Sequence, residues 1–367
     1  MIWGARYTGA MTSMWLTHQR LFQLRLSQPD LRTPAEVVRW LGAVQAQEYA
    51  HALYAVGLRM PTATERQVEQ AIADREIVRT WPMRGTIHFV PAEDARWMLT
   101  LLARRTNRTA ASVYRRAGVT DEQFARAGDV LARTLQGGGI ATRKELYAAL
   151  AAAGIATDGE QRGLHLLGYW AREGLICLGP RQGKQPTFTL LDEWVPRSRA
   201  LEGDEALATL ARRYFTSHGP ATAQDFAWWS GLTLTEARLG LRLAEQDLAR
   251  RTVDGQTYWL SPTAPDASVA DGHSAYLLPP YDEFTVAYKD RDALLHAAFP
   301  REPFAILGPV ILVDGQLVGS WKRTLKRDRV MLSFTLYATL SEPQSAALTE
   351  AVRRYGEFVG LPVVVAP

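Results

Sequence analysis

Hydrophobic and polar residues are spaced along the chain in a pattern that predicts helices followed by a two-stranded hairpin. Near the N-terminus, apolar residues recur at helical spacing, and Thr33 before Pro34 is typical of the cap and first turn of a helix. Two short segments of β-like composition then flank a turn near Met83 to Gly85. The predicted helices are residues 15–27, residues 34 to between 42 and 47, and residues 63–76, and the predicted hairpin is residues 77–91.

The same order of elements recurs twice further along the chain. In the second set the predicted hairpin turn contains Arg181, Gly183 and Lys184, and in the third set Asp254-Gly255 is a strong signal for a two-residue turn. Helices followed by a hairpin are the order of a winged helix, so the sequence predicts three such modules in tandem. The second set has helices at 142–154 and 158–174 and a hairpin at 175–191; the third has helices at 204–219, 222–231 and 233–247 and a hairpin at 248–261.

From about His273 the pattern changes to extended segments interrupted by proline, with a hairpin turn at Asp314-Gly315 and a closing helix at residues 342–360. We therefore predict a mainly α fold with small β wings, plus a C-terminal α+β domain. The predicted boundaries are 15–106 for the first winged helix with a bridging helix, 107–195 for the second, 203–262 for the third and 273–367 for the C-terminal domain.

Composition narrows the class of protein. The chain has 367 residues, 47% of them hydrophobic, which is enough to bury a sizeable core. No apolar run approaches the length of a membrane span, and the N-terminal segment lacks the continuous apolar core of a secretion signal. We expect a cytoplasmic, nucleoid-associated monomer that does not bind membranes. Cys177 is the single cysteine and lies in an apolar run, which favours a buried thiol and excludes an internal disulfide.

The basic residues favour contact with nucleic acid. Five of the 42 are lysines, which leaves 37 arginines, and arginine suits bidentate contacts to phosphates and base edges. A net charge of +4 is compatible with DNA binding, although an arginine-rich composition also follows from genome base content. Winged helices place their hairpins against the DNA backbone, but hairpin ends carry exposed charges in any protein. The candidate DNA contacts are Arg79, Arg84, His88, Arg181, Lys184, Lys322 and Arg323.

Two glutamines, Gln45 and Gln47, flank Ala46 where the second predicted helix ends. On a regular helix, side chains two positions apart point about 200° away from each other, so the pair converges only if the helix ends or unwinds there. A carboxamide does not titrate, but its oxygen can hold a water and its nitrogen can donate. Such a pair suits a reaction whose leaving group needs no protonation, for example departure of a cationic alkylated purine from its sugar.

Several motifs together resemble the AlkZ-type DNA glycosylases, a bacterial winged-helix family that includes azinomycin-resistance and crosslink-unhooking enzymes. They are "VQAQ" at residues 44–47, "TWPMRGTIHFVP" at 80–91, "LLPPYDEFTVAYKDR" at 277–291 and "GQLVGSWKR" at 315–323. The resemblance implies a C-shaped arrangement of tandem winged helices that excises N-alkylated bases from double-stranded DNA and unhooks interstrand crosslinks. It places Gln45 and Gln47 at the catalytic water, in the branch of the family with two glutamines, with Ala46 between them.

Other readings stay open from the residues alone. Glu48 could supply a carboxylate beside the pair or form a surface ion pair, and Asp282 and Glu283 could be an acid–base pair, metal ligands or buried structural groups. The principal hypothesis is a monofunctional glycosylase that uses water and no cofactor or metal. The alternatives are a DNA-binding transcriptional regulator or architectural protein that breaks no bond, and a regulator whose C-terminal domain binds a small effector.

Overall fold

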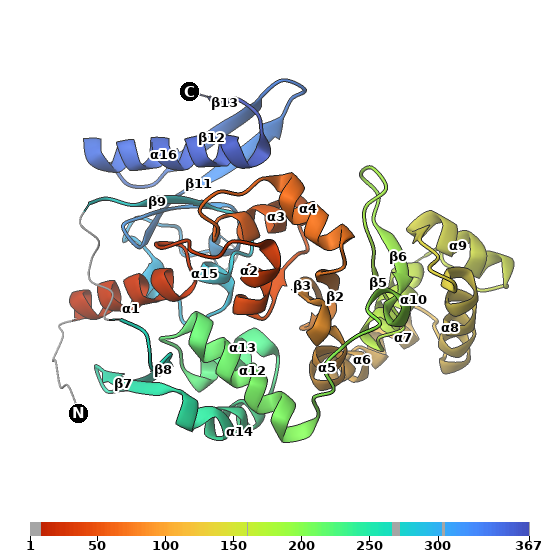
Figure 1. Cartoon of the computed structure of the whole chain (residues 1–367). Coiled ribbons are helices and arrows are strands. Elements are labelled where there is room, and N and C mark those ends of the chain that lie inside the picture. Colours follow the sequence, from red (N-terminus) through yellow and green to blue (C-terminus); the bar gives the residue numbers. More distant parts are fainter. Residues whose placement is uncertain (1–8, 160, 266–271, 303–304, 367) are drawn as a thin grey trace. The chain divides into compact units, whose positions relative to one another are not determined.

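The computed structural model describes residues 9–159, 161–265, 272–302 and 305–366. The chain divides into two compact units (Figure 1). One, here called the split unit, is made of Met1–Val68 and Ala208–Pro367, and the other, the continuous unit, is Glu69–Leu207. Among the described residues, no helix combines the length and apolar character needed to span a bilayer.

The N-terminal part of the split unit contains the predicted helices and one more. Thr33 caps the second helix and forms a capping box with Glu36, which confirms the predicted start at Pro34. Gly42 ends that helix with φ of 79°, a conformation that favours glycine. A short apolar helix, α3, follows and was not predicted. The elements are α1 (Gly9–Gln23), α2 (Pro34–Leu41), β1 (Val44–Gln45), α3 (Tyr49–Gly57) and α4 (Glu65–Ala73). The unit boundary after Val68 falls within α4.

The third predicted set of helices and hairpin is present in the split unit. Thr222 and Thr233 cap two of its helices, each with a capping box, and the strands turn at Asp254 and Gly255 with φ of 49° and 77°. These signals are local, which is why the sequence located the elements correctly. They are α12 (Gly203–His218), α13 (Ala223–Ser230), α14 (Leu234–Ala244), β7 (Ala249–Val253) and β8 (Gln256–Leu260). The unit boundary before Ala208 falls within α12.

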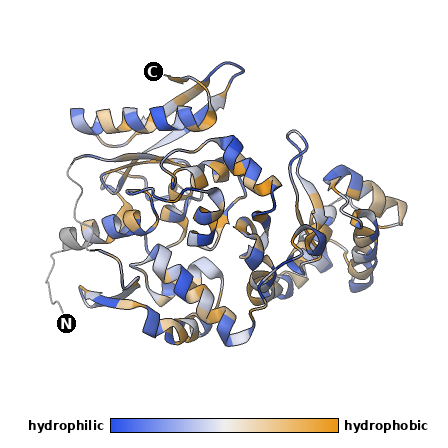
Figure 2. Cartoon of the chain, in the orientation of Figure 1, coloured by the Kyte–Doolittle hydropathy of each residue, from blue (hydrophilic) through white to orange (hydrophobic). Residues whose placement is uncertain are grey.

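The C-terminal part of the split unit is a five-stranded sheet in the order β13-β12-β11-β10-β9, with α16 beside it (Figure 1). Buried residues of α16 recur at helical spacing, and hydrophobic and hydrophilic positions alternate along it in Figure 2. Tyr355 of α16 packs edge-on against Trp321 of β11 and Tyr54 of α3, so helix, sheet and N-terminal segment share one core. The elements are β9 (Ala275–Leu278), α15 (Glu283–Val286), β10 (Val310–Val313), β11 (Gln316–Leu325), β12 (Val330–Leu336), α16 (Glu342–Val359) and β13 (Val363–Val365).

In the continuous unit, the first and second predicted hairpins belong to the same sheet. Arg79 of β2 pairs with Leu178 of β5, which joins the hairpins in the order β3-β2-β5-β6-β4. After the first hairpin, where the sequence predicts a bridging helix, the chain forms several short helices. The strands are β2 (Ile77–Met83), β3 (Thr86–Pro91), β4 (Ala141–Thr142), β5 (Ile176–Leu178) and β6 (Thr187–Leu190), and the main helices are α5 (Ala95–Met98), α6 (Arg104–Thr109), α7 (Ala111–Arg116), α8 (Asp121–Leu135), α9 (Arg143–Ala152), α10 (Arg162–Arg172) and α11 (Leu191–Trp194).

Candidate active site

The two glutamines lie where the chain has left the helix. α2 ends at Leu41, and Val44 and Gln45 are extended, so the helical geometry that would point side chains two residues apart to opposite sides does not apply at the motif. The expected end of the helix before the motif is therefore observed. Gln45 is 7% exposed, Ala46 is fully buried and Gln47 is exposed. The small apolar residue fixes the segment in the core while the second carboxamide faces solvent.

A buried carboxylate lies behind the motif. Glu283, the first residue of α15, is 1% exposed, and its Oε1 accepts the backbone N–H of Gln45 at 3.4 Å. Its Oε2 accepts the indole N–H of Trp229 at 2.9 Å and lies 3.2 Å from Nε2 of His218. The contact joins residues 238 positions apart in the sequence, so no local pattern could have revealed it.

The neighbouring Asp282 has a structural role. It is fully buried, caps α15 by accepting the N–H of Phe284, and forms two hydrogen bonds of 2.8 and 2.9 Å with the equally buried Arg59. A bidentate partner satisfies the charge that burial would otherwise make costly. Within the described ranges, no three His, Cys, Asp or Glu residues are grouped closely enough to hold a metal ion.

Glu48 and Cys177 are two other candidates for chemistry. Glu48 is exposed at the start of α3 and makes no side-chain cap there. Cys177 is fully buried in β5, and burial raises the pKa of its thiol to about 12. A thiol in that setting stays protonated and unreactive at neutral pH, as the sequence predicts.

The first hairpin buries two of the candidate DNA contacts. Arg79 is 8% exposed, and His88 is fully buried, with Nδ1 3.0 Å from the carbonyl oxygen of Thr86 and Nε2 3.4 Å from Nη2 of Arg84. Burial, and secondarily the charge of Arg84, lowers the pKa of His88 to about 3. The ring is therefore neutral, and a direct contact of Arg79 or His88 with DNA would require the hairpin to rearrange. Arg84, at the turn, is half-buried.

The second hairpin lies beside a basic hollow of about 690 Å³ in the continuous unit. Lys184 lines it and is exposed, whereas Arg181 is half-buried and donates to the carbonyl oxygen of Lys184. Arg143 and Lys144, at the start of α9, line the same hollow, and none of its described lining residues is acidic. Sequence reasoning missed this pair because helix starts usually favour acidic side chains.

Lys322 and Arg323 occupy successive positions of β11 and so point to opposite faces of the sheet. Lys322, opposite Ser333, is exposed. Arg323, opposite Leu332, is half-buried, and its Nη1 donates to the hydroxyl of Tyr355 in α16 at 2.6 Å. Of this pair, only Lys322 is an exposed side chain.

Comparison with known proteins identifies the family. The family model that matches describes AlkZ-like DNA glycosylases and spans residues 38–358 of this chain. The chain belongs to the AlkZ-like DNA glycosylase family. An interstrand DNA cross-link repair glycosylase of Streptomyces sahachiroi is 31% identical, in an alignment covering 83% of this chain and 85% of that protein. The solved structure of Streptomyces sahachiroi DNA glycosylase AlkZ is 24% identical, covers 96% of this chain and 99% of that one, and has a TM-score of 0.76.

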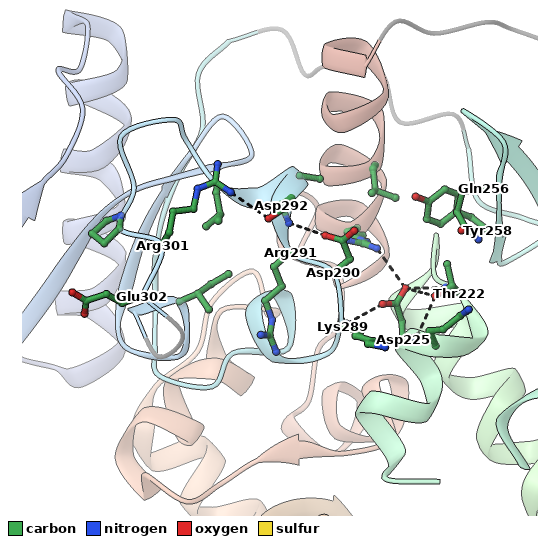
Figure 3. A pocket seen from close by; sticks show the side chains of 17 residues that line it. Thr222, Asp225, Gln256, Tyr258, Lys289, Asp290, Arg291, Asp292, Arg301 and Glu302 are labelled. Atoms are coloured by element: carbon green, nitrogen blue, oxygen red, sulfur yellow. Dashed lines mark hydrogen bonds and ion pairs between the residues drawn. The ribbon is translucent and has the colours of Figure 1, made fainter. Parts of the chain in front are cut away.

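This AlkZ-like DNA glycosylase also has a cavity in the split unit, lined by side chains of both charges (Figure 3). It measures about 770 Å³, and neither Gln45 nor Gln47 lines it. Because its charges are balanced, it offers a polyanion no net attraction. Its charged lining residues are Arg20, Asp225, Lys289, Asp290, Arg291, Asp292, Arg301 and Glu302.

Proposed function

We propose that this protein is a monofunctional DNA glycosylase that hydrolyses the N-glycosidic bond of cationic, N-alkylated purines with a water held by Gln45 and Gln47. The observation that carries the proposal is the position of the motif after the end of α2 at Gly42, with Gln45 buried in a short strand and Gln47 exposed. Family membership supports excision of a base over simple DNA binding.

In the proposed reaction, the C1′–N bond breaks and its electron pair leaves with the base, which becomes neutral. The base therefore needs no proton from the protein. A carboxamide oxygen accepts a hydrogen bond from the water and orients the water toward C1′. As the C1′–O bond forms, the water becomes positively charged, and the same oxygen stabilises this charge. The proton of the water then passes to solvent. Two carboxamides meet these demands without any titratable group.

DNA binding is proposed to use exposed cations of both units. Lys184, Arg143 and Lys144 line a hollow with no described acidic lining, and Lys322 is exposed on β11. Arg84, Arg181 and Arg323 are half-buried, so they are proposed as secondary contacts. Such contacts neutralise phosphates and carry no sequence preference.

The direct test is incubation of the purified protein with methylated duplex DNA, followed by alkali. A glycosylase leaves abasic sites that alkali converts to strand breaks, together with free alkylated base. A protein that only binds, such as a transcriptional regulator, gives a footprint without product. If the wild-type protein releases no base from any alkylated duplex, the enzymatic proposal is wrong and the regulator is favoured.

Unhooking of interstrand crosslinks is a further part of the proposal. It rests on the similarity to the Streptomyces sahachiroi protein, whose name describes cross-link repair. Duplexes crosslinked with an azinomycin-type or a mustard-type agent test it, because unhooking converts one crosslinked species into two separable strands. Excision of monoadducts with no loss of the crosslinked band would limit the substrate class to monoadducts.

A further inference from the structure

The buried carboxylate of Glu283 is in contact with the backbone of the glutamine motif. Its described partners are three donors: the N–H of Gln45 at Oε1, and the indole of Trp229 and the ring of His218 at Oε2. Glu283 and His218 are 1% and 0% exposed, so both side chains are shielded from bulk solvent. The carboxylate thus links a segment near the N-terminus to α12, α13 and α15 of the same unit.

The hydrogen-bond pattern determines which protons this cluster holds. Ser217 has one hydroxyl hydrogen, and its Oγ lies 2.8 Å from the carbonyl oxygen of Arg213, which can only accept. The same Oγ lies 2.8 Å from Nδ1 of His218, and therefore it accepts a hydrogen bond from Nδ1–H. The contact of 3.2 Å between Nε2 of His218 and Oε2 of Glu283 then contains at least one proton.

The carboxyl group of Glu283 is held at both of its oxygens. The N–H of Gln45 donates to Oε1, and the indole N–H of Trp229 donates to Oε2, beside the ring of His218. A buried hydrogen-bond network whose members are satisfied makes its surroundings rigid, so its contribution is a fixed geometry. Here the geometry that is fixed is that of the Gln45 backbone.

We infer that Glu283 is a positioning residue for base excision. Through Oε1 it holds the N–H of Gln45 and keeps the segment after α2 extended, and this conformation directs the carboxamides of Gln45 and Gln47 to one water. His218 and Trp229 hold Oε2 and so fix the carboxylate. The inference rests on the proposed function, because it assigns Glu283 to the positioning of the proposed catalytic pair.

Two variants separate positioning from charge. Glu283→Gln keeps the size of the side chain but places an NH₂ group against existing donors. Glu283→Asp keeps the negative charge near His218 but is one methylene shorter, so it cannot reach both Trp229 and the N–H of Gln45.

The matched control is Asp225→Asn. Asp225 is a carboxylate that is 3% exposed and pairs with Arg20, and its hydrogen bonds go to Thr222 and Lys289 and not to the motif.

Two measurements are made on the full-length variants. The first is the single-turnover rate of excision with enzyme in saturating excess over alkylated duplex, which does not depend on the fraction of enzyme that is folded. The second is hydrogen–deuterium exchange of a peptide that includes Gln45, which needs no activity. Loss of a hydrogen bond to a charged group predicts a fall in rate of about 10-fold to 100-fold in both Glu283 variants, with unchanged affinity for lesion DNA. It also predicts faster exchange at Gln45, and Asp225→Asn should change neither.

The outcomes distinguish this inference from the proposed function. If Gln45→Ala and Gln47→Ala are slow but both Glu283 variants excise at the wild-type rate, the positioning role is wrong and the glutamine mechanism stands. If Glu283→Gln is slow and Glu283→Asp is not, charge and not position is what matters, and the inference fails. If the two glutamine variants excise at the wild-type rate, the glutamine mechanism fails and the inference fails with it.

Discussion

At the scale of single residues, the choice of carboxamides over carboxylates determines how the site responds to substitution. If Gln45 and Gln47 act on one water, replacement of either by alanine should lower the single-turnover excision rate by about 10² or more and leave the Kd for lesion DNA nearly unchanged. The double variant should be little slower than the worse single variant, because groups that act on one water are not additive. Excision at the wild-type rate in both single variants would show that the glutamines take no part.

Replacing Gln47 with aspartate tests the same chemistry through pH. Because Gln47 is exposed, a carboxylate there remains solvated and ionised at neutral pH. Gln47→Asp should retain activity at neutral pH and lose it as the pH falls and the new carboxylate is protonated. The wild-type rate should not show this dependence. Rates of both proteins on one substrate between pH 4 and 8 provide the measurement, and identical profiles would contradict the assignment.

His88 makes stability depend on pH in a predictable direction. Its folded-state pKa is about 3, against 6.5 for an ordinary histidine, because the ring is buried beside Arg84. Between these two values the unfolded chain binds a proton that the folded chain does not, so the free energy of unfolding decreases as the pH falls from about 6.5 toward 3. In His88→Gln this decrease should become shallower, as measured by urea denaturation at several pH values. An unchanged slope would mean that His88 is not held neutral.

At the scale of elements, the two hairpins that carry exposed cations should contribute independently to DNA binding. Lys184→Ala in the second hairpin and Lys322→Ala in β11 should each weaken binding to all sequences alike and reduce the slope of log K against log [salt] by about one. Arg353→Ala serves as the control, because Arg353 of α16 is already paired with Glu350 and Glu357. Loss of affinity for one sequence alone would indicate a base contact instead.

Much of this organisation follows from local signals. Caps at Thr33, Thr222 and Thr233 and the turn at Asp254-Gly255 place helices and hairpins where the sequence predicts them. The short helix α3 was missed, because "YAHALYAVG" at residues 49–57 is apolar on nearly every side and has no clear period. The sequence marks Glu283 as a titratable residue but does not predict its partner, since a contact across 238 residues leaves no mark on the local pattern.

At the scale of the whole molecule, charge should dominate affinity for undamaged DNA. The net charge is only +4, but exposed cations stand on both units. If several of them each neutralise one or two phosphates, log K should fall with log [salt] with a slope of roughly −4 to −8. Fluorescence anisotropy with an unmodified duplex at increasing salt measures this slope. A flat response would remove phosphate neutralisation as the source of binding.

The split unit also determines when a newly made chain becomes able to act. Gln45 leaves the ribosome early, but the carboxylate that contacts it is 238 residues further on, so the ribosome must translate for roughly 10–50 s between the two. The continuous unit, Glu69–Leu207, is complete within that interval. A chain that stalls or is cut before α15 therefore contains the whole continuous unit but lacks the carboxylate that contacts Gln45. If Glu283 positions the glutamine pair, such a fragment should excise alkylated bases more slowly than the full-length protein.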